Sequence, residues 1–267
     1  MAKQHRSKRT PIPAAKHILY IASIEKAFRL LGAFDQKSPE LSLSQLAAAT
    51  SLTIPNVQRV THTLLELGLL VKDGVHKKYA LTPRALEIGY RYLQSNPLVE
   101  RAAPYLANLA NRSQETVNLT VLDGTEAVYV ARHRGLQTIP VNLFIGARLP
   151  AFATGVGQVM LAFLPPAEAE AILERSDWKK FTRHTLPDVA TVMRKLERIR
   201  KAGYAVEDQE MFLGGMAVAA PVIGHSGRAV AAVNVGIPTS RFSIAEAERR
   251  FAKMVLETGR AIFEPSY

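Results

Sequence analysis

Two short helical patterns, separated by a tight turn and followed by a basic hairpin, occupy residues 41–82 of this chain. Ser42 followed by Gln45 is a capping box, in which the serine hydroxyl accepts an exposed backbone amide and the glutamine side chain reaches back. Apolar or small residues then recur on one side at helical spacing: Leu43, Leu46 and Ala47. A helix is therefore predicted to begin just after Ser42.

A second helix is predicted after the turn at residues 50–53. Thr53 can cap it, and Pro55 falls in its first turn, where a missing amide costs no hydrogen bond. The predicted inward stripe consists of Ile54, Val57, Val60 or Thr61, and Leu64. We expect this helix to end at Gly68 and to leave polar side chains facing outward: Asn56, Gln58, Arg59, His62 and Thr63.

Those outward side chains suit DNA recognition. Asn and Gln can make paired hydrogen bonds to adenine and Arg to guanine, each worth about 1–3 kcal/mol of discrimination. Strand-like residues then flank the Asp73-Gly74 turn, which predicts a hairpin whose cations meet phosphate. The pattern indicates a winged helix-turn-helix, with Gln58 and Arg59 as the main base-reading candidates. The full predicted DNA-contacting set is Ser42, Ser44, Thr53, Pro55, Asn56, Gln58, Arg59, His62, Lys77 and Lys78. The alternative interpretation is a helical hairpin and a β-hairpin that together bind a protein partner.

The charge distribution favours DNA. Residues 1–80 carry 12 Lys and Arg against 5 Asp and Glu, a net charge of +7, whereas residues 81–267 carry 22 against 18. Binding should therefore depend on salt through counterion release. Residues 1–19 are interpreted as a flexible basic arm, which either enters a minor groove or remains a solvated tail.

Composition excludes several classes of protein. The chain has 267 residues, 48% of them hydrophobic, which is ordinary for a globular protein. It contains no cysteine, so disulfides, thiolate zinc sites and cysteine nucleophiles are excluded. We find neither an apolar run of about 18 residues nor a signal-peptide pattern, and we expect a cytoplasmic protein that does not bind a membrane.

The rest of the chain suggests further units. A helix over residues 23–34 should support the winged domain, and Thr82-Pro83 should start a linker helix capped by the threonine. A further helix is expected over residues 98–111. The predicted domains are an arm at 1–19, a winged domain at 20–82, a linker helix at 83–97 and an effector-binding domain at 98–267.

The last region alternates between strands and helices. Strands are predicted over residues 116–122 and 127–132, joined at Asp123-Gly124, and over 204–207, 217–222 and 229–235, the last two joined by the turn at 225–228. Helices are predicted over residues 155–163, 166–174, 189–201 and 244–262. This order predicts an α+β fold with helices packed on an antiparallel sheet.

The chain resembles the IclR family of bacterial transcription regulators from about Ile21 onward. The residues that carry the likeness are Ser23-Ile24-Glu25-Lys26-Ala27, Leu43-Ser44-Gln45-Leu46-Ala47, Tyr79-Ala80-Leu81-Thr82-Pro83, Val121-Leu122-Asp123-Gly124, Gly146-Ala147-Arg148-Leu149-Pro150, Gly203-Tyr204-Ala205 and Ala219-Ala220-Pro221. The resemblance implies a winged DNA-binding domain, a linker helix, a GAF-like effector-binding domain, and assembly as a homodimer or homotetramer.

Four segments look like the family branch that regulates aromatic-acid catabolism, including the protocatechuate and hydroxybenzoate pathways: Val141-Asn142-Leu143, residues 146–154, Asp208-Gln209-Glu210 and residues 231–235. The chain departs from this branch at Gly155-Val156-Gly157-Gln158, where Ser-Met-Gly-Arg is usual, so a ligand-side hydroxyl and a cation are missing. It also has Pro55-Asn56 where many members have Ser-Thr, so operator preference cannot be transferred.

The family pocket, carried over residue by residue, implies an effector site at Gly155, Val156, Glu207, Asp208, Ala217, Asn234 and Gly236. A helix N-terminus offers amides to a carboxylate, and Val156 and Ala217 offer apolar walls. Alternatively, the two glycines only form turns and the two acids form a solvated strand end. Four basic residues are candidate counter-charges, although solvation is the expected role for most: Arg132, His133, Arg134 and Arg148.

Catalytic motifs are incomplete. Gly224-His225-Ser226-Gly227 would need glycine at position 228 to form a nucleophile elbow, and Gly155-Val156-Gly157 lacks the third glycine of a dinucleotide fingerprint. We therefore expect no enzyme, cofactor or metal site. The predicted function is a DNA-binding regulator modulated by a small organic acid, such as an aromatic carboxylate. A non-sensing architectural DNA-binding protein and a regulator of non-aromatic acid metabolism remain the alternatives.

Overall fold

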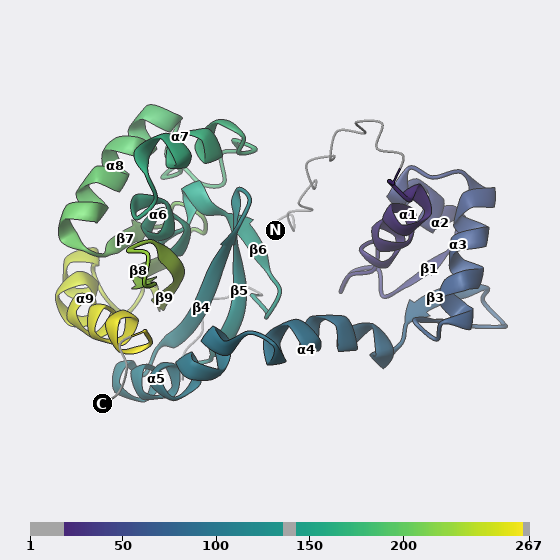
Figure 1. The fold of residues 1–267 in the computed structure, drawn as a ribbon, viewed down its shortest axis with the longest axis horizontal. Helices are drawn as coiled ribbons and strands as arrows, with labels where there is room; N and C mark the ends of the chain where they lie inside the picture. Colours follow the sequence, from purple (N-terminus) through teal and green to yellow (C-terminus); the bar gives the residue numbers. More distant parts are fainter. Residues whose placement is uncertain (1–18, 136–142, 264–267) are drawn as a thin grey trace. The chain divides into compact units, whose positions relative to one another are not determined.

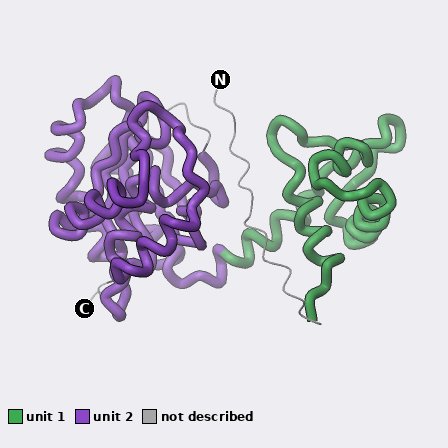
Figure 2. Tube along the Cα trace, turned by 90° about the horizontal axis from the view of Figure 1, so that it is seen from above, with its two compact units in different colours: residues 1–92 green, residues 93–267 purple. Residues whose placement is uncertain are grey.

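The computed structural model describes residues 19–135 and 143–263, which form two compact units divided between Tyr92 and Leu93 (Figure 2). Almost all of the expected basic arm lies outside the described residues, as do Val141 and Asn142 of the family likeness. Each unit is described separately below.

Residues 19–81 of the first unit form three helices and a small antiparallel sheet (Figure 1). Its elements are α1 (Ala22–Leu31), β1 (Glu40–Ser42), α2 (Leu43–Thr50), α3 (Ile54–Glu66), β2 (Leu70–Lys72) and β3 (Lys78–Leu81), with the strands in the order β1-β3-β2. Buried Leu30, Leu46 and Val57 join the three helices in one core with Tyr79 of the sheet. This is the predicted winged helix-turn-helix, with β1 as an addition that the sequence pattern did not predict.

Helix ends in this unit confirm one prediction and contradict two. Ser42 and Gln45 form the complete capping box at α2. Thr53 stands at the N-cap of α3 but makes no capping hydrogen bond, because its hydroxyl accepts from Asn56 Nδ2 at 2.9 Å. Thr82 likewise does not cap, because its hydroxyl donates to the Gly68 carbonyl at 2.6 Å. Neither hydroxyl therefore accepts a hydrogen bond from a backbone amide at the start of its helix.

Three further details differ from expectation. Ile54, predicted to face inward, is 43% exposed, whereas Val57, Thr61 and Leu64 are buried as predicted. The Asp73-Gly74 signal marks the turn correctly, but the loop extends over residues 73–77, and Lys77 rather than Gly74 takes a positive φ, of 52°. Residues 83–85 form a 3-10 turn before α4 (Leu86–Gln94) begins.

The second unit is a six-stranded antiparallel sheet with helices on both faces (Figure 1). Its strands are β4 (Thr116–Asp123), β5 (Glu126–His133), β6 (Arg148–Pro150), β7 (Ala205–Asp208), β8 (Gly215–Ile223) and β9 (Ala229–Pro238), in the order β6-β5-β4-β9-β8-β7. Its helices are α5 (Pro97–Ser113), α6 (Gly155–Ala162), α7 (Pro166–Glu174), α8 (Val189–Ala202) and α9 (Ile244–Ala261). The α+β fold with an antiparallel sheet is confirmed, and β6 is a strand that the pattern did not predict.

The side-chain alternation of β9 separates the two faces. Ala231, Val233 and Val235 pack into the core formed with α5 and α9. The intervening residues are Ala232, Asn234 and Gly236, which belong to the face covered by α6. Small residues on that face leave space between the sheet and α6. The site described next occupies this space.

Helix α6 is held close to its neighbours by a glycine. A Cβ on Gly157 would lie 2.3 Å from both Cα and the carbonyl oxygen of Ala151, so no larger residue fits without movement. Thr154 caps the helix, since its hydroxyl accepts from the Gly157 amide at 3.2 Å. All of α6 is buried, and its first turn faces the sheet at the cavity. No helix within the described part of the chain is long and apolar enough to cross a membrane.

Candidate functional site

The recognition helix α3 presents three of the predicted DNA-reading side chains to solvent. Gln58, Arg59 and His62 are exposed, and none makes a polar side-chain contact with the rest of the described chain. Asn56 differs, because its amide nitrogen donates to Thr53 and its oxygen accepts from Lys26 Nζ at 3.4 Å. The fold therefore uses Asn56 internally and leaves the other three for a ligand.

The remaining predicted contacts lie at the ends of these elements. Thr53 and Pro55 are exposed at the start of α3, Ser44 is exposed on α2, and Ser42 is half-buried with its hydroxyl in the capping box. In the hairpin, Lys77 is exposed and Lys78 is half-buried.

One hairpin cation was missed. Lys72 of β2 is exposed, with its ammonium 5.6 Å from the centre of the Tyr79 ring. Its position beside the loop at residues 73–77 adds a cation to the predicted basic wing.

The second unit contains a cavity between the first turn of α6 and the sheet. Six of the seven residues predicted for the effector site line it: Gly155, Val156, Glu207, Ala217, Asn234 and Gly236. Asp208 does not line it; it is half-buried, and its carboxylate accepts from Gln209 Nε2 at 3.1 Å. Gly236 is not a turn residue, because it pairs with Thr116 and Ala217 inside the sheet.

Glu207 is buried, which excludes the solvated-strand-end interpretation for this residue. It is only 7% exposed, and its Oε1 accepts from the backbone amides of Glu210 and Met211. Burial, followed by the neighbouring charge of Glu210, raises the pKa of Glu207 to about 8. The side chain is therefore predominantly neutral at pH 7.

Gly155 makes room for this carboxyl group. A Cβ at position 155 would lie 3.2 Å from the Cβ of Glu207, closer than ordinary van der Waals contact. The glycine that replaces the branch's usual serine thus fits the large acidic side chain opposite it. The hydroxyl missing at position 155 is offset by a polar group from β7.

Gln158 does not line the cavity, so its replacement of the usual arginine removes no cation from the cavity wall. The side chain is fully buried, and Nε2 donates to the Phe152 carbonyl at 2.8 Å and to Glu210 Oε2 at 2.6 Å. Lys195 of α8 forms an ion pair with the same Glu210. The expectation that position 158 is on the ligand side is wrong for this chain.

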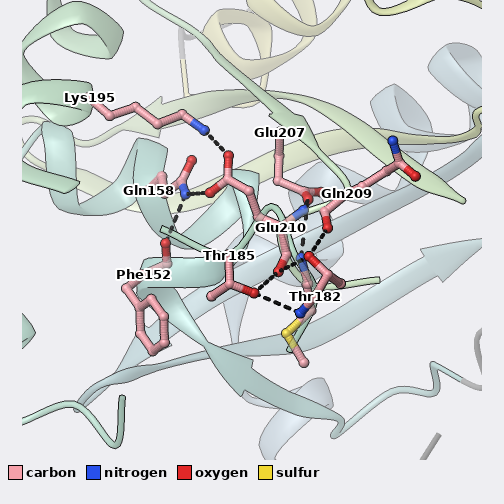
Figure 3. Close-up of polar contacts among 9 residues, drawn as sticks. Phe152, Gln158, Thr182, Thr185, Lys195, Glu207, Gln209 and Glu210 are labelled. Atoms are coloured by element: carbon pink, nitrogen blue, oxygen red, sulfur yellow. Dashed lines mark hydrogen bonds and ion pairs between the residues drawn. The ribbon is translucent and has the colours of Figure 1, made fainter. Parts of the chain in front are cut away.

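Two threonines fix the segment that carries Glu210 (Figure 3). The hydroxyl of Thr182 donates to the Gln209 carbonyl at 2.6 Å, and that of Thr185 donates to the Glu210 carbonyl at 2.8 Å. Because Glu210 and Met211 donate their amides to Glu207, this network also sets the orientation of the cavity carboxyl group.

A second polar group lines the cavity on the same face of the sheet, from strand β5. Arg132 of β5 lines the cavity and donates from Nη1 to Asn118 Oδ1 at 3.0 Å, and Asn118 Nδ2 donates to Asn234 Oδ1 at 3.0 Å. These residues stand opposite one another on adjacent strands. Burial lowers the pKa of Arg132, and its Nε is buried without a hydrogen-bond partner among the described residues. Of the four candidate counter-charges, Arg132 is thus one that lines the cavity.

The other candidate counter-charges are arranged differently. Arg148 forms ion pairs with Asp123 and Glu126, both at 2.7 Å, and does not line the cavity. Arg134 is exposed. Within the described residues no cluster of histidines and acids could hold a metal ion.

Comparison with known proteins supports this organisation. The IclR helix-turn-helix domain model matches residues 23–74, and the model for the C-terminal domain of bacterial IclR transcriptional regulators matches residues 90–264. This chain belongs to the IclR family. It is accordingly a DNA-binding transcriptional regulator with an effector-binding C-terminal domain, and not an enzyme.

Two relatives more than 30% identical to this chain are named as regulators. The Pca regulon regulatory protein of Pseudomonas putida is 32% identical over 242 residues, covering 90% of this chain and 82% of that protein. The p-hydroxybenzoate hydroxylase transcriptional activator of Acinetobacter baylyi is 33% identical over 227 residues, covering 83% of each.

Solved IclR-family structures share the fold. The Thermotoga maritima IclR structure has a TM-score of 0.72 and 28% identity, covering 91% of this chain and 98% of that one. An IclR homologue from Microbacterium hydrocarbonoxydans complexed with 4-hydroxybenzoate has a TM-score of 0.76 and 21% identity, covering 90% and 97%.

The IclR-family cavity contains polar residues that the motif comparison did not select, chiefly Asn118 and Tyr129. Tyr129 is 4% exposed, and burial raises the pKa of its hydroxyl. A sequence clue existed for Asn118, since Thr116, Asn118 and Thr120 alternate with apolar residues in a strand. Such alternation marks one polar face of an otherwise buried strand.

Proposed function

We propose that this regulator binds a small organic acid, specifically an aromatic carboxylate, in the cavity between α6 and the sheet. The observation that carries the proposal is the combination of an α6 N-terminus, apolar walls such as Val156 and Ala217, and an uncharged Glu207 in one cavity. An ionised acid in this cavity would repel a carboxylate ligand, whereas a neutral one would not.

Similarity to regulators named for the Pca regulon, the Pca operon and p-hydroxybenzoate hydroxylase supports the aromatic class. Regulators with other names, including KdgR and XynR of Escherichia coli, are 29% and 31% identical, so a non-aromatic acid is the second candidate. Because the target is the chromosome, we infer that the protein acts in the cytoplasm.

A ligand screen tests the sensor function. The full chain is titrated with 4-hydroxybenzoate, 3,4-dihydroxybenzoate, pyruvate and succinate, and its thermal unfolding is followed at each concentration. Ligands that bind the native state raise the apparent stability, by about 2.7 kcal/mol at one hundred times Kd. We expect the aromatic acids to give the largest shift. No shift with any of the four acids would contradict the proposal.

Asn234→Ala provides a test of position. This variant should reduce the shift caused by the acid and leave operator binding without ligand unchanged, because Asn234 lines the cavity in the second unit. Asp208→Asn is the matched control, since Asp208 follows the cavity residue Glu207 on β7 but does not itself line the cavity. An equal effect of both substitutions would contradict the placement of the ligand.

For DNA, we propose that α3 enters the major groove with Gln58 and Arg59 at the bases, while Lys77 and Lys78 bind phosphate. Arg59→Ala should weaken specific binding by about 1–3 kcal/mol and affect random DNA much less. The operator is first obtained by selection from random duplexes, and Arg198→Ala, an exposed arginine of α8, is the control. Equal losses on operator and random DNA would remove Arg59 from base reading.

We further propose that the protein acts as a homodimer or homotetramer, with residues 83–97 linking a winged domain at 20–82 to an effector domain at 98–267. Large apolar side chains are exposed on α1 and α4: Ile24 is 52%, Phe28 49%, Leu86 73% and Ile88 52% exposed. Such surfaces favour association with a second copy, and two copies can read two half-sites. Light scattering should give a multiple of the 29.3 kDa chain mass; a monomer would contradict this.

A further inference from the structure

Arg132 is a half-buried cation that lines the cavity without an acidic partner. None of the ion pairs within the described residues includes it, and its Nε is buried without a hydrogen-bond partner there. Residues 136–142, which follow soon after in the chain, contain no Asp or Glu. A desolvated guanidinium needs an anion or further acceptors to offset its lost hydration. The arrangement favours a ligand that brings a negative charge to β5.

The neighbouring asparagines are oriented by this arginine. A guanidinium only donates, so Asn118 must turn its oxygen to Arg132 and its amide nitrogen to Asn234. Asn234 therefore accepts through its oxygen and keeps its own amide nitrogen as a donor at the cavity. The Arg132 guanidinium on β5 and Asn234 Nδ2 on β9 are thus two donor groups at the cavity, which is the pattern that a carboxylate accepts.

The opposite flank of the cavity has a different character. Glu207 lies on β7, which β4, β9 and β8 separate from β5 in the sheet. Its Oε1 is taken by two backbone amides, and Oε2 accepts no hydrogen bond among the described residues. As a neutral group, Glu207 can both donate a hydrogen bond to a ligand hydroxyl and accept one from it, while the apolar residues between the flanks suit the body of the ligand.

Resting on the proposed sensor function of the cavity, we propose that Arg132 determines effector specificity by binding the carboxylate, with Asn234 as second donor and the far polar end of the effector at Glu207. The ligand class is a small monocarboxylate with a hydroxyl group at its opposite end. The sequence offers Arg132 only as one of four candidate counter-charges, and the geometry assigns the ligand carboxylate to this residue on β5.

The test compares a charged ligand with its uncharged analogue. The full chain is titrated calorimetrically with 4-hydroxybenzoate and with methyl 4-hydroxybenzoate, which keeps the ring and hydroxyl but has no negative charge. The wild type should prefer the acid. Arg132→Gln should reduce this acid-to-ester preference on the order of 30-fold or more, the effect expected from loss of one partner of a desolvated charged pair.

Three controls distinguish recognition from folding. Arg132→Lys keeps the charge and should restore part of the preference for the acid. Arg134→Gln removes an exposed arginine two positions along the chain and should leave the preference unchanged. Ester binding by Arg132→Gln serves as the folding control, because the ester needs an intact cavity and no counter-charge.

The outcomes separate this inference from the proposed function. If the wild type binds 4-hydroxybenzoate and Arg132→Gln retains the full acid preference, Arg132 does not bind the carboxylate, although the sensor function stands. If Arg132→Gln binds neither acid nor ester, the residue is structural and the inference fails. If the wild type binds none of the four acids of the ligand screen, the proposed function and this inference fail together. If only pyruvate or succinate binds, the assigned ligand class, a monocarboxylate with a hydroxyl group at its opposite end, is contradicted.

Discussion

Gly157 illustrates how a single residue sets the cavity, because a Cβ there would lie 2.3 Å from Ala151 backbone atoms. Gly157→Ala should therefore push α6 away from residue 151 and lower the free energy of unfolding by about 1–3 kcal/mol, the usual cost of overpacking. Chemical denaturation can be followed by fluorescence of Trp178, which stacks on Phe152 with ring centres 4.2 Å apart.

Gly155→Ala is the graded comparison, since its Cβ would meet Glu207 at 3.2 Å and not a backbone atom at 2.3 Å. It should lower the unfolding free energy less than Gly157→Ala. Equal losses, or no loss at position 157, would show that α6 has more freedom than the packing indicates.

Glu207 gives the second unit a specific pH dependence. Its pKa of about 8 lies above the ordinary value of 4.5, so the folded state retains a proton that the unfolded chain has lost between these pH values. Stability should therefore fall as pH rises from about 4.5 to 8, at up to about 1.4 kcal/mol per pH unit from this group. The charged and titratable groups around it are Glu210, Lys195, Tyr129 and Arg132.

Glu207→Gln should flatten this decline, because it keeps a neutral polar group at every pH. Asp208→Asn, next in the chain and outside the cavity wall, is the control and should keep the wild-type profile. Binding of an acid should also weaken above pH 8 in the wild type only. A wild-type profile in Glu207→Gln would show that another group causes the decline.

At the level of elements, the wing should supply affinity without sequence preference. Lys77→Ala combined with Lys78→Ala should weaken binding to operator and random DNA alike and lower the slope of log affinity against log salt by about 2, since each lysine releases about one counterion. A loss confined to the operator would instead assign these lysines to base recognition.

The elements also show what sequence patterns can predict. The long helices and β4, β5, β8 and β9 were predicted because their periodicity extends over many residues. The strands β1 and β6 span only Glu40–Ser42 and Arg148–Pro150, too short to show alternation, and each forms by pairing with a neighbouring strand. Thr53 and Thr82 resemble caps in the sequence, but the fold gives their hydroxyls other partners.

The residues of the cavity could be predicted from the sequence only in part, because some of them are brought together by contacts between distant segments. The family likeness predicted that Gly155, Glu207 and Asn234 belong to one site, and all three line the cavity. The role of Arg132 depends on residues 118 and 234, which reach it only through strand pairing. Gln158 turns from the cavity because Glu210 and Phe152 capture its amide group. Neither contact is visible in local sequence.

For the whole molecule, we propose that the first unit reads the operator and the second senses the acid. An architectural DNA-binding protein would need only the first of these, whereas a sensor needs DNA binding to depend on the ligand of the second. A sensor is therefore distinguished from an architectural protein by an effect of the acid on DNA binding, and not by DNA binding or acid binding alone.

The most direct measurement of the central claim is operator affinity of the full chain with and without saturating 4-hydroxybenzoate, at fixed salt and pH 7. The account predicts a change of about 5–150-fold, the usual range of allosteric coupling, and no change in Arg132→Gln at the same acid concentration. Unchanged affinity in the wild type, with binding of the acid demonstrated in the same sample and no change in transcription from the operator, would contradict it.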